Sequence, residues 1–208
     1  MRVSVFLVGI LFFNTGCRVN WEAQFNTAVT NENFVGAKQL MRQQLAADNF
    51  NFPKETGRAR AYYRIAYAHG KLAEYDSMKV ALDSSLAQDA NFSRLKRELI
   101  EYFSLEEFNK AVNLYNNFFF DKAIAQFKIA VGIVGSEAPY EEYAAIIYRC
   151  LAYAEASNNN VETALEYCHK ASNLGDALSK RVLLEWEKEK KMTPPNKLEP
   201  REKPTITI

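Results

Sequence analysis

A spacing of small and apolar residues that recurs along the chain constrains its fold more than any other feature. The pattern has four positions: a first residue and the residues 12, 16 and 19 positions after it. We call each set of four a frame. Two frames match best: Ala111, Ala123, Phe127 and Ala130, and Ala152, Ala164, Cys168 and Ala171. Weaker frames start at Phe25 and Ala66, so the starting residues lie 41, 45 and 41 positions apart. Such an internal repeat indicates an array of similar units that bury their apolar faces against one another.

The units are expected to be helical. Between Trp21 and Lys191 the chain has only two prolines, Pro53 and Pro139, and it contains no Asn-Gly or Asp-Gly hairpin turn. Apolar residues recur every three or four positions, as in Ile124, Phe127 and Val131. With 48% hydrophobic and 25% charged residues, the composition is that of a folded protein rather than a disordered one. The predicted fold class is all-α.

The spacing resembles the tetratricopeptide repeat, a 34-residue helix-turn-helix unit. In that family a large residue stands four positions before the first small one, and Trp21, Tyr62 and Tyr148 match this while Glu107 departs from it. Asparagines at 31 and 33, at 116–117 and at 158–160 suit the turns between helices. The resemblance implies a right-handed superhelix of about four hairpins, at residues 18–51, 59–92, 104–137 and 145–178.

Two boundaries follow from local signals. The third hairpin starts either with a capping box at Ser104–Glu107 or within a helix that runs unbroken from Ser93. After Gly175 and Asp176, an apolar stripe predicts a capping helix at 176–192, which would cover the end of the stack. The last residues, 193–208, contain four prolines and little apolar content, so we expect an extended, disordered tail.

The N-terminus has the features of an export signal. An apolar run of 11 residues follows Arg2, which is too short to span a bilayer and typical of a signal peptide at 1–16. Thr15-Gly16-Cys17 resembles a bacterial lipobox, which implies lipidation of Cys17 and a membrane anchor. The alternatives are a conventional signal or a short uncleaved anchor. Because Arg18 follows the cysteine, the resemblance implies the outer membrane, facing the periplasm.

Catalytic and cofactor motifs are not found in the sequence. A net charge of +1 disfavours nucleic-acid binding, and there is no phosphate-binding glycine loop or nucleophile elbow. The eighteen-residue spacing of Cys150 and Cys168 fits no metal pair, so we interpret them as buried thiols, with a disulfide as the alternative. We expect no enzyme activity, no metal and no small-molecule cofactor.

The resemblance also implies a binding face. In the related repeats, four residues of the first helix line a concave groove. Counted from the first small residue of the repeat, they stand three positions before it and one, four and five positions after it. The partner-binding residues expected on this basis are Tyr63, Tyr67, Lys71, Phe108, Tyr115, Asn116, Arg149 and Tyr153. The alternative for Tyr63, Tyr67 and Tyr153 is that they pack between neighbouring hairpins.

These observations lead to a hypothesis of function. The chain is expected to be a non-catalytic adaptor or scaffold of the bacterial cell envelope that binds a peptide or a partner protein. One alternative is a permanent subunit of an outer-membrane assembly or secretion machine. Another is an envelope hydrolase, which would need two carboxylates facing each other across the groove, where only Glu22 is expected.

Overall fold

The computed structural model describes residues 20–47, 55–135, 139–189 and 194–202. The described residues form nine α-helices and one 3-10 helix, with no β-strand, which confirms the all-α prediction. The helices are α1 (Trp21–Thr30), α2 (Phe34–Ala47), α3 (Glu55–Lys71), α4 (Tyr75–Gln88), α5 (Ser93–Asn116), α6 (Phe120–Val134), α7 (Glu141–Ser157), α8 (Val161–Asn173) and α9 (Ala177–Glu189); the 3-10 helix η1 (Ala90–Phe92) precedes α5.

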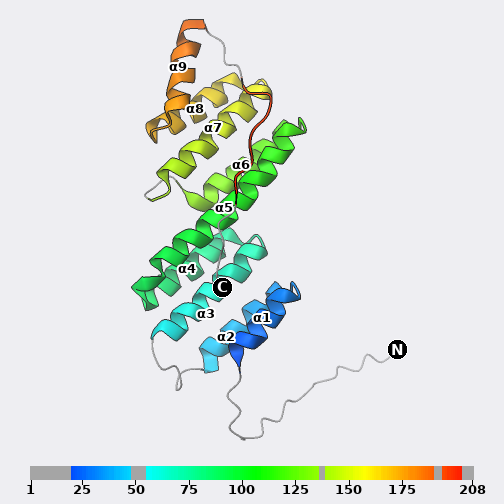
Figure 1. Ribbon diagram of the computed structural model, residues 1–208, viewed down its shortest axis with the longest axis vertical. Coiled ribbons are helices and arrows are strands. Elements are labelled where there is room, and N and C mark those ends of the chain that lie inside the picture. The colour runs from blue at the N-terminus through cyan, green and yellow to red at the C-terminus, as the bar shows by residue number, and fades with distance from the viewer. Residues whose placement is uncertain (1–19, 48–54, 136–138, 190–193, 203–208) are drawn as a thin grey trace, which may run out of the picture.

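The first eight helices pair into four hairpins, and α9 follows the last of them. Each helix packs mainly on its neighbours in chain order, and α9 packs on α8. The second and third hairpins meet through contacts of α5 with α3 and α4. The result is an elongated array with α1 and α2 at one end and α9 at the other (Figure 1).

All four hairpins share one turn geometry. A single residue with positive φ lies in each turn: Glu32, Ala73, Phe118 and Asn159. The next residue in each turn donates its N–H to the carbonyl five residues back, as Asn33 does to Ala28. This is the hydrogen bond of a Schellman-type helix end. Because these turn residues lie 41, 45 and 41 positions apart, their spacing equals that of the sequence repeat.

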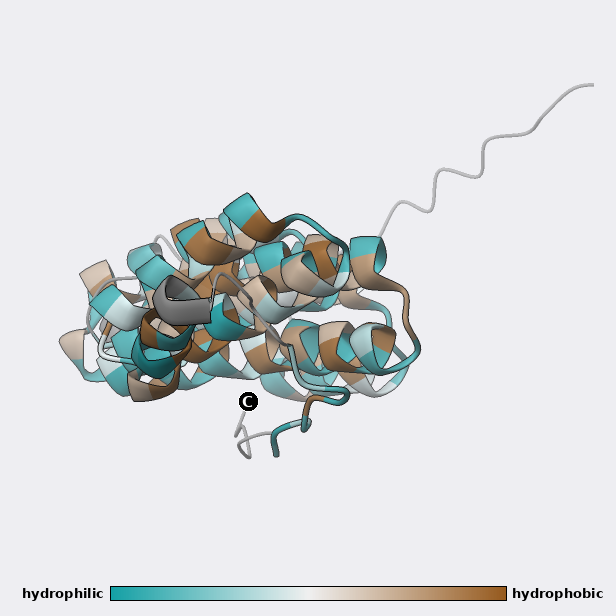
Figure 2. Cartoon of the chain, turned by 90° about the horizontal axis from the view of Figure 1, so that it is seen from above, coloured by the Kyte–Doolittle hydropathy of each residue, from teal (hydrophilic) through white to brown (hydrophobic). Residues whose placement is uncertain are grey.

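The repeat positions form the centre of the core. Of the sixteen residues in the four frames, fifteen are buried, including those of the two weaker frames, and Gln44 is half-buried. Small residues such as Ala66, Ala111 and Ala152, all with no exposed surface, allow close packing between helices. In an end-on view, each helix carries both hydrophobic and hydrophilic residues, as expected when one side faces the core (Figure 2).

The predicted capping box at Ser104–Glu107 is wrong, and the alternative of an unbroken helix from Ser93 is correct. Ser104 lies in the middle of α5, where its buried hydroxyl donates to the carbonyl of Ala130 in α6 at 2.8 Å. The Ser85 hydroxyl of α4 makes the matching bond to the Ala59 carbonyl of α3 at 2.7 Å. A serine therefore joins the two helices at equivalent places in the second and third hairpins.

Two further predictions concern the cysteines and the N-terminus. Cys150 and Cys168 are buried free thiols, and burial raises the pKa of Cys150 to about 12. The signal peptide at 1–16 and the lipidation site Cys17 lie outside the described residues. Among the described helices, none has the length and apolar character that crossing a bilayer requires.

Candidate peptide-binding face

The eight expected partner-binding residues lie on α3, α5 and α7, which are the first helices of the second, third and fourth hairpins. We call the side of the array that carries them the first-helix face. On α3, Tyr63 and Tyr67 are buried, which agrees with the packing alternative for both. The ring of Tyr67 contacts those of Phe34 and Phe103, with centroids 6.4 and 6.0 Å away. Burial raises the pKa of Tyr63 to about 12. Neither ring offers much surface to a partner.

Lys71, at the end of α3, is enclosed by aromatic rings. Its Nζ lies 5.0 Å from the ring centroid of Tyr102 and 5.6 Å from that of Phe103, distances typical of cation–π contacts. Nζ is also 3.1 Å from the Tyr102 hydroxyl and 3.6 Å from a carboxylate oxygen of Glu106. Burial alone would lower the pKa of Lys71, but the Tyr102 hydrogen bond and the Glu106 charge raise it above its ordinary value. The ammonium therefore stays charged and is already satisfied within the chain.

The expected residues of α7, together with Phe108, also serve packing and capping. Phe108 is buried against Phe127, with ring centroids 5.6 Å apart. Arg149 Nη1 is 2.5 Å from Asp176 Oδ1, and Asp176 Oδ2 accepts the N–H of Ser179 at 2.7 Å in the first turn of α9. Arg149 thus holds the residue that caps α9. Tyr153 is half-buried.

The remaining two expected residues, Tyr115 and Asn116, bind the chain's own C-terminal tail. Asn116 Nδ2 donates to the carbonyl of Leu198 at 2.9 Å, and the N–H of Leu198 donates to Asn116 Oδ1 at 2.8 Å. The Tyr115 hydroxyl donates to the carbonyl of Pro195 at 2.5 Å. Tail residues 194–202 were expected to be disordered, but in the structure they lie extended along α5 (Figure 1).

A second asparagine of α5 repeats the arrangement. Asn109 Nδ2 donates to the carbonyl of Arg201 at 2.7 Å, and the N–H of Arg201 donates to Asn109 Oδ1 at 2.8 Å. Each asparagine therefore satisfies both main-chain groups of one tail residue. We call Asn109, Tyr115 and Asn116 of α5, together with Tyr143 of α7, the tail-binding site.

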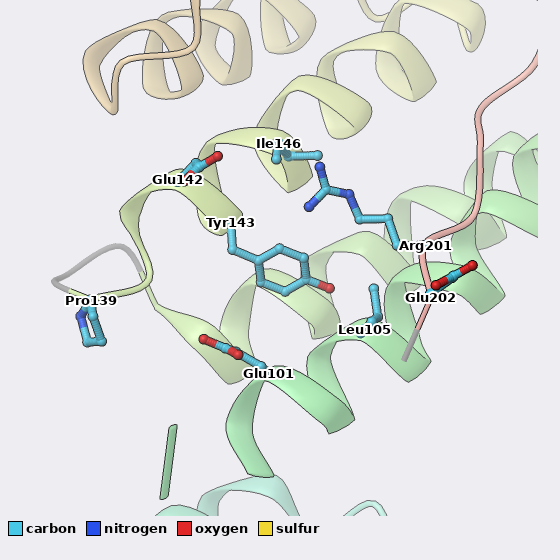
Figure 3. A pocket seen from close by; sticks show the side chains of 8 residues that line it. All are labelled: Glu101, Leu105, Pro139, Glu142, Tyr143, Ile146, Arg201 and Glu202. Atoms are coloured by element: carbon cyan, nitrogen blue, oxygen red, sulfur yellow. The ribbon is translucent and has the colours of Figure 1, made fainter. Parts of the chain in front are cut away.

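The side chain of Arg201 reaches a pocket between α5 and α7. The pocket has a volume of about 540 Å³, and Glu101, Leu105, Glu142, Tyr143 and Ile146 are among its lining residues (Figure 3). The guanidinium carbon lies 5.9 Å from the centroid of the Tyr143 ring. Burial raises the pKa of Glu101, whereas the Arg97 charge lowers it. A cation from an extended segment therefore finds an aromatic face here, at the mouth of a pocket that glutamates help to line.

Sequence reasoning missed Asn109, Tyr143 and the tail itself. Asn109 and Asn116 are seven residues apart on one helix, so they share a face, and this spacing was a usable signal. The mapped family positions did not include Asn109. Low apolar content predicted a disordered tail, but the described contacts hold the tail mainly through its main chain.

In comparisons with known proteins, no protein-family model, curated protein or solved structure matched this chain. Within the residues that the structure describes, no cluster of three or more His, Cys, Asp or Glu side chains is arranged to bind a metal ion. What the described face offers chemically is recognition of an extended main chain.

Proposed function

We propose that this chain is a non-catalytic adaptor or scaffold of the bacterial cell envelope, which binds an extended peptide or partner segment on its first-helix face. The observation that carries the proposal is the pair of asparagines on α5, each of which holds both main-chain groups of one tail residue. Amide side chains used in this way recognise extended backbone. They leave most of the ligand's side chains unconstrained, as suits an adaptor.

The proposed architecture supports this role. We infer that the four hairpins form a right-handed superhelix like that of tetratricopeptide repeats, which the resemblance in sequence and the shared turn geometry both favour. In such a stack the binding residues are fixed by packing before a ligand arrives. Little conformational entropy is then lost on binding.

The location is part of the proposal. A signal peptide at 1–16 and a lipid on Cys17 would tether the stack to a membrane, and Arg18 favours the outer membrane facing the periplasm. The alternative role is a permanent subunit of an outer-membrane assembly or secretion machine. That role would keep a partner bound at fixed stoichiometry, whereas an adaptor exchanges its partners.

Photo-cross-linking in cells tests the binding face. A photoreactive residue in place of Glu142, which is exposed on α7 and lines the Arg201 pocket, is expected to cross-link a partner of reproducible mass. The matched control is Val80, which is 66% exposed on α4. This helix is the second of its hairpin, so Val80 does not belong to the first-helix face. We expect it to give no such product. Equal cross-linking at the two positions, or none at Glu142, would argue against binding on this face.

A further inference from the structure

The tail contacts of α5 recur at every third tail residue. The three tail residues that α5 hydrogen-bonds are Pro195, Leu198 and Arg201. A period of three is that of the polyproline II helix, and the prolines at 194, 195 and 200 favour that conformation. Pro195 and Leu198 are half-buried, whereas Arg201 and the residues between the contact residues are exposed. The main-chain carbonyls of the three contact residues therefore face α5.

The spacing of the asparagines matches this period. Seven residues of α-helix rise by about 10.5 Å, and three residues of polyproline II rise by about 9.3 Å. Asn116 and Asn109 can therefore each hold one tail residue when these two are three apart, as Leu198 and Arg201 are. Asn116 holds the earlier tail residue, Leu198, and Asn109 holds the later one, Arg201. The tail therefore runs antiparallel to α5. A helical or compact ligand would not present its backbone to both.

The side chains of two contact residues add specificity. Leu198 is half-buried and packs against the hydrophobic core. The side chain of Arg201 is exposed, and its guanidinium carbon lies 5.9 Å from the centroid of the Tyr143 ring. Pro200, just before Arg201, needs no hydrogen-bond acceptor for its nitrogen. The site thus favours an aliphatic residue followed three positions later by a cation.

We propose that the tail-binding site is a receptor for polyproline II segments that carry an aliphatic residue and, three positions later, a basic one. Residues 194–202 occupy it as an internal ligand, and an outside segment of the same chemistry binds by displacing them. This inference rests on the proposed adaptor function and names the ligand class of the same face. A tethered occupant competes at an effective concentration in the millimolar range, so the unmodified chain binds such a segment weakly.

A labelled synthetic peptide with the sequence of residues 194–202 is the probe. Its Kd is measured by fluorescence anisotropy for the full chain and for the full-length double variant Leu198→Asp, Arg201→Glu, whose own tail has lost its apolar contact and its cation. We expect the variant to bind the peptide about tenfold more tightly or better, because the internal competitor is weakened. Adding Asn109→Asp and Asn116→Asp, which remove both amide donors but keep acceptor oxygens, is expected to abolish saturable binding.

Two controls make the result specific. A peptide of the same composition, with its leucine and arginine two positions apart instead of three, should bind far more weakly. If the variant with both asparagines replaced does not fold, Asn116→Asp alone in the tail-weakened background should still reduce affinity, with circular dichroism to check its helix content. Equal affinity of the full chain and the tail-weakened variant, or equal binding of the two peptides, would overturn the inference.

The outcomes also separate this inference from the proposed function. A partner cross-linked at Glu142, combined with no peptide binding to the tail-weakened variant, would overturn the ligand class and leave the adaptor proposal standing. Peptide binding without any cross-linked partner would support the site and count against the adaptor. Sedimentation showing a dimer that the peptide dissociates would place the tail in a second copy and overturn the internal arrangement.

Discussion

Replacing Phe127 with alanine is expected to lower the free energy of unfolding by about 3–5 kcal/mol. Phe127 has no exposed surface, lies at the step-16 position of the third repeat on α6, and contacts the ring of Phe108 on α5. Removing the ring leaves a cavity that the surrounding helices cannot fill without losing their own contacts. Urea denaturation followed by circular dichroism measures the loss.

The matched control is Phe119, the N-cap residue of the same helix, which lies eight residues earlier and is 54% exposed. Phe119→Ala is expected to change stability by no more than about 0.5 kcal/mol, as is usual for surface positions. Equal losses from the two substitutions would show that the repeat positions do not form the core, and the hairpin register would then be wrong.

Gly70→Ala is expected to destabilise the protein by about 1–3 kcal/mol through overpacking. A Cβ on Gly70 of α3 would lie 2.2 Å from Cε2 of Phe103 on α5. That ring cannot move aside easily, because it packs against Tyr67, Tyr75 and Tyr102. The strain falls on the junction between the second and third hairpins, where α3 and α5 meet.

Gly132→Ala provides the control with the opposite sign. Gly132 is exposed on α6, and an added Cβ there meets nothing within 4 Å. Because alanine is the better helix former, this substitution is expected to stabilise the protein by about 0.5–1 kcal/mol. Thermal unfolding of both variants measures the two changes. A Gly70→Ala variant as stable as Gly132→Ala would contradict the close approach of α3 and α5.

Much of the fold could be predicted because burial at the repeat positions depends on spacing more than on residue type. Phe25 and Met78 stand at positions where the other three repeats have alanine, yet both are fully buried. The length of α5 could not be predicted from the Ser104–Glu107 pattern. Those residue types suit a helix start, but they also suit a helix interior when Ser104 bonds to Ala130 and Glu107 accepts from the Tyr75 hydroxyl at 2.6 Å.

The candidate site could be predicted only in part. The family positions pointed to Tyr115 and Asn116, which do contact the tail. They also pointed to Lys71 and Arg149. Their charges are paired with Glu106 of α5 and with Asp176 just before α9, and helix periodicity alone does not reveal such partners. The tail was missed because its described hydrogen bonds use main-chain groups, which carry no sequence signal.

The central claim is that the first-helix face holds an extended segment by its main chain. NMR measurement of amide hydrogen exchange in the full chain tests it most directly. The amides of Leu198 and Arg201, which donate to Asn116 and Asn109, should exchange more slowly than those of Lys197 and Glu199, for which the described part of the chain shows no acceptor. Uniformly fast exchange from 196 to 202 would contradict the claim.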